Sequence, residues 1–197
     1  AQNTTADSVI RYDTSTGDRT SSINGGTVTY NGTSTKLINY ENLASGAPLV
    51  VNSTLNVPGA IIFDNTYLNG VQGQITSANA WQYGTTAQVG IPVTASLTAK
   101  GGIYIRGVVG ASSSTAQPGY DAVTIGTTTP ITLQTTGTFV AGTDAITVVG
   151  IQPSVNTSKN AINITGSGNI SILNNSIGGR TTFIANSGNY NDIISIT

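Results

Sequence analysis

The chain has 197 residues, only 8% of them charged, and its net charge near −1 leaves no basic stripe to neutralise the phosphates of a nucleic acid. It contains no His and no Cys, which excludes imidazole bases, thiolate nucleophiles, disulfides and the usual transition-metal sites. Its apolar runs are far shorter than the roughly 20 residues that a membrane-spanning helix needs. We therefore expect neither an enzyme nor a resident cofactor or metal.

Short runs rich in Val, Ile, Thr and Tyr recur along the whole chain, and Gly, Pro and Asn separate them. Helix-forming residues are scarce, and no segment carries a long apolar stripe at helical spacing. The composition of the runs is typical of strands, and the residues between them are typical of turns. We predict an almost wholly β protein with about a dozen strands.

The first predicted strand lies in residues 5–22, "TADSVIRYDTSTGDRTSS", where a long polar run follows it. Alternation places four residues on the face of this strand that would enter a groove: Ala6, Ser8, Ile10 and Tyr12. The polar run has the composition of an extended connector. We predict that residues 1–22 are an N-terminal donor strand and linker, which completes the sheet of a neighbouring copy and builds an open, head-to-tail filament. The alternative is that residues 8–12 are the first strand of their own sheet.

Residues 23–197 are predicted to form the head, an antiparallel β-sandwich of the jelly-roll or Ig/pilin-like type. In "AINITGSGNISIL" (161–173), Ile162 and Ile164 share one face and Ile170 and Ile172 repeat the pattern, which predicts a hairpin with one buried and one wet face. The rival fold is a parallel β-helix, although no steady period of roughly 20–25 residues is visible. The stretch "ASSSTAQPG" (111–119) suits a boundary between two smaller domains and equally one long surface loop.

Seven Asn-X-Ser/Thr sequons are candidate N-glycosylation sites: Asn3, Asn31, Asn52, Asn156, Asn163, Asn169 and Asn174. Asn163 and Asn169 lie on strand faces that we predict to be wet. The alternative is that a chain rich in Asn, Ser and Thr contains such triplets by composition alone. The sequence starts "AQNTT" without Met, as though a secretion signal had been removed before Ala1. We expect an extracellular or cell-surface location.

Two other groups of residues offer alternatives to a structural role. Asp64 and Asp121 would act as a glycosidase-like carboxylate pair if folding brought them together. A carbohydrate-binding module would stack sugars on the few aromatic side chains, which are Trp81, Tyr83, Tyr104 and Tyr120. Trp81 and Tyr83 also have the spacing of ordinary core packing. A viral capsid, spike or tail-fibre protein would share the same uncharged, β-rich composition.

As a whole design, the chain resembles the thread filaments of Sulfolobales archaea, which are secreted, glycosylated β-proteins joined by an N-terminal donor strand, similar in logic to bacterial chaperone–usher pilins. The segments that carry the resemblance are "AQNTTADSVIRYDTS" as donor, "TGDRTSS" as linker and the β-rich remainder with its seven sequons. The Cys pair usual in the bacterial pilins is missing. The resemblance implies a structural subunit of an extracellular filament for adhesion or biofilm formation, whose partners are identical subunits and cell surfaces or glycans.

Overall fold

The computed structural model describes residues 8–13, 21–29, 36–41, 49–64, 76–78, 80, 90–153, 158–187 and 194–196 of the chain. These residues form fifteen β-strands and contain no α-helix, so the prediction of a β protein is confirmed. All of the strand pairings between them are parallel. The predicted antiparallel β-sandwich is therefore wrong. The chain forms a parallel β-helix, the rival fold considered from the sequence.

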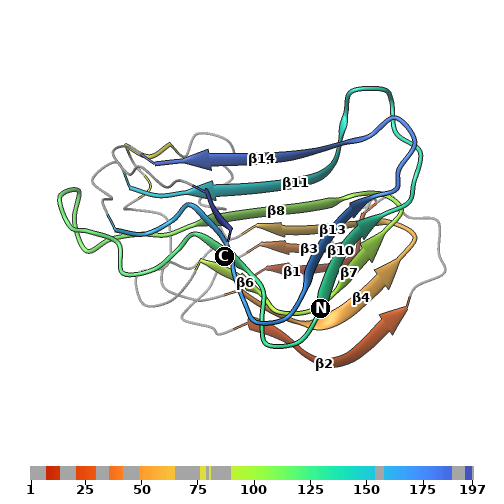
Figure 1. The fold of residues 1–197 in the computed structure, drawn as a ribbon, viewed down its shortest axis with the longest axis horizontal. Coiled ribbons are helices and arrows are strands. Elements are labelled where there is room, and N and C mark those ends of the chain that lie inside the picture. The colour runs from red at the N-terminus through yellow and green to blue at the C-terminus, as the bar shows by residue number, and fades with distance from the viewer. Residues whose placement is uncertain are drawn as a thin grey trace.

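One sheet, which we call sheet A, contains six of the described strands in chain order, and each lies beside the strand of the next coil. In Figure 1 the labelled strands of this sheet lie one above another, from β1 through β3, β8 and β11 to β14 at the top. These strands are β1 (Ser8–Asp13), β3 (Lys36–Glu41), β5 (Ala60–Asp64), β8 (Ile103–Val108), β11 (Asp144–Ile151) and β14 (Arg180–Asn186).

The other strands form a second hydrogen-bonded system that bends into two further faces. The bend lies in β4 (Leu49–Val57), where Val51 pairs with β6 and Leu55 pairs with β7. One face contains β6 (Ile91–Val93), β9 (Val123–Ile125), β12 (Ile162–Ile164) and β15 (Ile194–Ile196), and the other contains β7 (Leu97–Ala99), β10 (Ile131–Thr135) and β13 (Ile170–Asn174). β2 (Ser21–Thr29) lies along β4.

The chain therefore visits three faces in turn, as in β5, β6, β7 and then β8, β9, β10, before it begins the next coil. The stretch 111–119 lies in the connection between β8 and β9, inside one coil, and sheet A continues on both sides of it. Coils differ greatly in length: register pairs Lys36 with Ala60, but Ile61 with Ile103. This variation explains why no steady period is visible in the sequence.

The core fills the space between the three faces with columns of aliphatic side chains. In sheet A, Ile61, Ile103 and Ile146 are register partners on successive coils, and all three are buried. The other faces contribute similar columns, of which Leu97 and Leu133 are fully buried partners. Burial of each such side chain stabilises the fold by about 1.5–3 kcal/mol.

The segment 161–173 shows which part of the sequence interpretation fails. Ile162 and Ile164 are buried, and Ile170 and Ile172 pack against the same core, so the predicted inward face is confirmed. The predicted hairpin is wrong, because β12 pairs with β9 and β15 whereas β13 pairs with β10. The Gly-Ser-Gly turn joins two faces of one coil.

Glycine makes the tight corner between these two faces possible. Gly126 has a φ of 138°, and a Cβ built on it would lie 1.8 Å from the carbonyl oxygen of Thr165 in the next coil. Gly166 occupies the corresponding corner, with a φ of 154°, and a Cβ built on it would lie 2.4 Å from the carbonyl oxygen of Thr127. Because no L side chain fits such a conformation and approach, glycine is required where corners stack.

Candidate functional site

The outer face of sheet A carries a hollow of about 530 Å³. Its wall is formed by side chains that point away from the core on successive coils. The floor is mostly apolar and includes Ile62, Tyr104, Val149 and Ile184, from β5, β8, β11 and β14. Register explains the arrangement, since Ile62 pairs with Tyr104 and Val149 pairs with Ile184. The hollow thus collects residues that are far apart in sequence.

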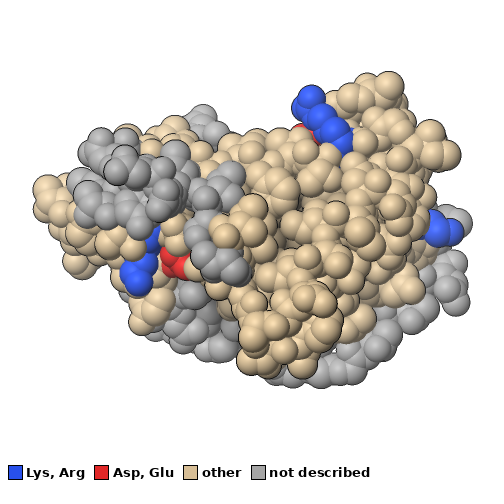
Figure 2. Space-filling model, viewed as in Figure 1, with Lys and Arg blue, Asp and Glu red and all other residues tan. Residues whose placement is uncertain are grey.

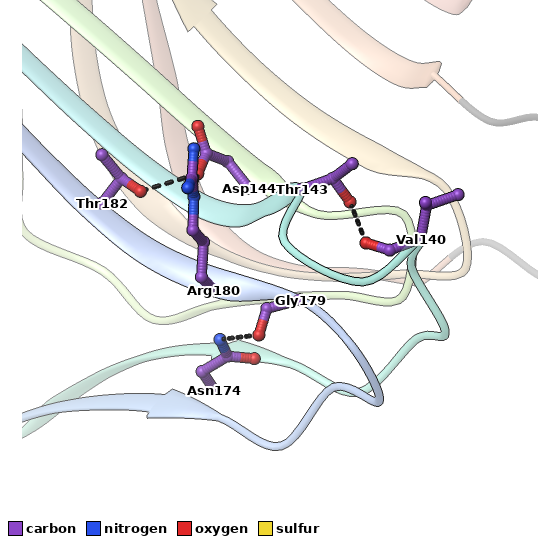
Figure 3. A network of polar contacts seen from close by, with 7 residues as sticks. All are labelled: Val140, Thr143, Asp144, Asn174, Gly179, Arg180 and Thr182. Atoms are coloured by element: carbon purple, nitrogen blue, oxygen red, sulfur yellow. Dashed lines mark hydrogen bonds and ion pairs between the residues drawn. The ribbon is translucent and has the colours of Figure 1, made fainter.

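A polar group lies at the edge of the hollow where β11 begins. Arg180 Nε donates to Asp144 Oδ1 at 2.5 Å, and Thr182 Oγ1 donates to the same oxygen at 2.6 Å (Figure 3). These hydrogen bonds from Arg180 and Thr182 lower the pKa of Asp144 below its ordinary value. The carboxylate therefore stays ionised over a wide pH range, and its Oδ2 receives no hydrogen bond from the part of the chain that the structure describes.

A buried ion pair lies in the outer column next to that of Tyr104. Arg106 Nη1 is 3.8 Å from Asp64 Oδ2, and the two side chains are 8% and 4% exposed. Burial raises the pKa of Tyr104, and the negative charge of Asp64 raises it further, while Arg106 opposes the shift. Tyr104 is therefore a neutral, half-buried phenol at physiological pH.

Apolar residues also gather on the outer side of sheet A, and one of them comes from the connection between β5 and β6. Ala80 in this connection is buried and packs in a second apolar cluster with Val108, Val149 and Ile151, against which Tyr104 lies. This cluster lies on the outer side of sheet A, so it extends the apolar floor of the hollow away from the solenoid core.

The predicted donor strand lies in β1, with Ser8, Ile10 and Tyr12 inside the described residues and Ala6 outside them. β1 pairs in parallel with β3 of the same chain, and Tyr12 lies opposite Tyr40. The predicted connector lies largely outside the described residues, and β2 begins at Ser21. The chain on its own therefore has β1 as the first strand of sheet A.

The sequons fall into three groups. Asn3, Asn31 and Asn156 lie outside the described residues, whereas Asn52 and Asn169 are exposed. Asn163 and Asn174 are half-buried, and their side-chain amides are used within the fold: Asn163 Nδ2 donates to Asp121 Oδ2 at 2.8 Å and Asn174 Nδ2 donates to the Gly179 carbonyl at 3.1 Å (Figure 3). Asn174 Oδ1 also accepts from the hydroxyl of Ser176. The structure does not bear out the expectation that Asn163 points freely into water.

Asp64 and Asp121 belong to separate networks. Asp64 pairs with Arg106, whereas Asp121 accepts hydrogen bonds from the Asn160 backbone and the Asn163 side chain. No group of three or more His, Cys, Asp or Glu among the described residues is arranged to hold a metal ion.

The predicted aromatic platform is divided. Of the two members of that set that the structure describes, Tyr104 lines the hollow, whereas Tyr120 lies in the connection between β8 and β9 with 40% of its surface exposed. Trp81 and Tyr83 lie outside the described residues. Sequence interpretation missed Asp144 and Ile184, because nothing in their local sequence marks them.

Comparison of the chain with protein-family models, with curated proteins and with solved structures found no match. Within the described residues, no helix has the length and apolar character needed to cross a membrane.

Proposed function

We propose that the chain is a structural subunit of an extracellular filament, in which copies join head to tail by strand addition and serve adhesion or biofilm formation. The observation that carries this proposal is the partly buried apolar surface on the last coil that the structure describes. Phe183 and Ile172 are only partly buried there, although their register partners one coil earlier, Val148 and Leu133, are fully buried. An additional coil would cover this apolar surface.

The strand edges at the two ends of sheet A support the same assembly. Among the described strands, β14 pairs only with β11 and β1 pairs only with β3, so each has one edge that no described strand pairs. A free edge of a parallel sheet presents unpaired N–H and C=O groups that bind a further strand. β1 of one copy added to β14 of the next would continue the sheet without changing its direction.

The register of sheet A determines which residues would be neighbours at this contact. One row of backbone register partners crosses every described strand of sheet A, and in a continuous sheet Tyr12 of the next copy would follow Phe183. Its members are Tyr12, Tyr40, Phe63, Ile105, Val148 and Phe183. An aromatic pair at the joint would contribute about 0.5–1.5 kcal/mol beyond the area it buries.

The surface is suited to close contact between copies. Figure 2 shows a face on which charged side chains are few and widely spaced. With a net charge near −1, stacked copies repel one another little. Exposed Asn52 and Asn169 leave positions for glycans away from the core.

The test compares assembly of the intact chain with that of two variants. Phe183→Asp places a charge at the proposed joint and should abolish fibres in electron micrographs. Leu173→Asp, on an outward position that is 42% exposed, is the matched control and should assemble normally. Circular dichroism and the melting temperature check that both variants fold.

A peptide of residues 4–14 provides a test without any substitution in the subunit. It should occupy the β14 edge and shorten the fibres, whereas the same peptide with Ile10→Asp and Tyr12→Asp should have no effect. Fibres that persist in folded Phe183→Asp and in excess peptide would contradict the proposal.

A further inference from the structure

The hollow on the outer face of sheet A has the make-up of a small-molecule site. Such sites are concave, mostly apolar and about 300–1,000 Å³ in volume, with a few polar groups that fix the orientation of the ligand. This hollow, of about 530 Å³, has a floor of Ile62, Tyr104 and Ile184, and polar atoms of Thr147 and Asp144 beside them. Nothing in the filament proposal uses these residues.

The charges of the hollow indicate an uncharged ligand. Asp144 is neutralised by Arg180, and the other lining side chains that the structure describes carry no charge at neutral pH. A carboxylate or phosphate on the ligand would be repelled by the Asp144 carboxylate, and a cation would be repelled by Arg180, which is 63% exposed. A neutral ligand avoids both conflicts.

The polar atoms indicate a ligand rich in hydroxyl groups. Both hydrogen bonds to Asp144 end on Oδ1, so Oδ2 is left to accept an O–H of a ligand in a charge-assisted hydrogen bond. The Tyr104 ring and the Ile184 side chain, 47% exposed, provide an apolar surface beside it. A pyranose ring matches both features of the hollow, since its C–H face is apolar and its hydroxyls donate hydrogen bonds.

We propose that this hollow is a binding site for a neutral oligosaccharide. The ring of one sugar packs on Tyr104 and Ile184, and a hydroxyl of the same or the next sugar donates to Asp144 Oδ2. The site lies on the outward side of sheet A and reaches the edge strand β14 at Ile184, and its binding is measured on the single subunit. The inference therefore does not rest on the proposed function.

The test uses the full chain and isothermal titration with neutral hexasaccharides of glucose, mannose, galactose and xylose, and with hexagalacturonate as an acidic probe. We expect at least one neutral probe to bind and hexagalacturonate to bind more weakly. Ile184→Arg fills the hollow with a long charged side chain and should weaken binding at least about tenfold. Ile177→Arg, at a 71% exposed position outside the hollow, should leave binding unchanged.

Three further variants separate recognition from folding. Tyr104→Ala should weaken binding by a similar factor while Tyr104→Phe retains it, because the ring and not the hydroxyl contacts the sugar. Asp144→Asn, at an exposed position, should weaken binding while the variant stays folded, as circular dichroism checks. The proposal is overturned if no neutral probe binds, if hexagalacturonate binds best, or if folded Ile184→Arg binds as well as the intact chain.

Discussion

Phe63 in β5 and Ile105 in β8 are register partners on successive coils, and neither side chain has any exposed surface. Each side chain packs in the core between the coil above it and the coil below it. The stability of the solenoid is therefore carried by contacts between coils, as in other repeat architectures, where each repeat contacts only its neighbours.

Truncation of a core column should be costly. Ile105→Ala removes a fully buried side chain from the middle of the column and should lower the free energy of unfolding by about 2–5 kcal/mol. Leu173→Ala, on an outward position, should change it by less than about 1 kcal/mol. Chemical denaturation of both variants checks the prediction, and equal effects would contradict the assignment of inward and outward faces.

Close packing between faces should make one glycine irreplaceable. A Cβ on Gly150 would lie 2.0 Å from the carbonyl oxygen of Ala161, so Gly150→Ala forces β11 away from the next face. We expect a loss of about 1–3 kcal/mol or more in thermal or chemical unfolding. Gly119→Ala, where nothing lies within 4 Å of the added Cβ, is the control and should be neutral or slightly stabilising. Tolerance of Gly150→Ala would refute the close approach.

The buried ion pair gives a third prediction. Arg106→Met removes the charge that compensates buried Asp64 and should destabilise the fold by about 3–5 kcal/mol. Lys100→Met, the same kind of change at an exposed position, should have little effect. If the two variants have the same melting temperature, Asp64 does not depend on Arg106.

Acid should remove the contribution of Asp144. Because the folded-state pKa of Asp144 is lowered, its stabilisation is present above the unfolded pKa and is lost as the pH falls through the folded value. The difference in melting temperature between the intact chain and Asp144→Asn should therefore shrink as the pH falls from about 5 to about 2. A difference that stays constant over this range would mean that Asp144 ionisation is not linked to folding.

N-glycans should be attached at exposed sequons rather than at half-buried ones. In a host that glycosylates this chain, peptide mapping by mass spectrometry should find glycan on exposed Asn169 and not on Asn163. Asn163 is half-buried, and its amide is held by Asp121, so an attached sugar would disrupt that contact. Occupied Asn163 beside empty Asn169 would contradict this order.

The sequence predicted the direction of side chains better than the pairing of strands. Alternation at Ile162 and Ile164 identifies a buried face, but the same alternation occurs in a hairpin and in a solenoid coil, so it cannot choose between them. The continuous run of β4 hides a bend between two faces. Insertions such as the one that separates β5 from β6 conceal the repeat.

The candidate site was less predictable than the fold. Tyr104 was singled out as an aromatic residue, but its partners Asp144 and Ile184 come from later coils and meet it only through register. The pairing of Asp64 with Arg106 has the same origin, because residues one coil apart become neighbours. No local motif encodes such contacts.

The axial repeat of native fibres, measured by cryo-electron microscopy, tests the central claim most directly. If copies continue the solenoid end to end, the six described strands of sheet A at about 4.8 Å spacing predict a subunit rise of about 29 Å, with a strong 4.8 Å reflection along the fibre axis. Fibres with a clearly different rise, strands that run parallel to the axis, or particles that do not polymerise would contradict it.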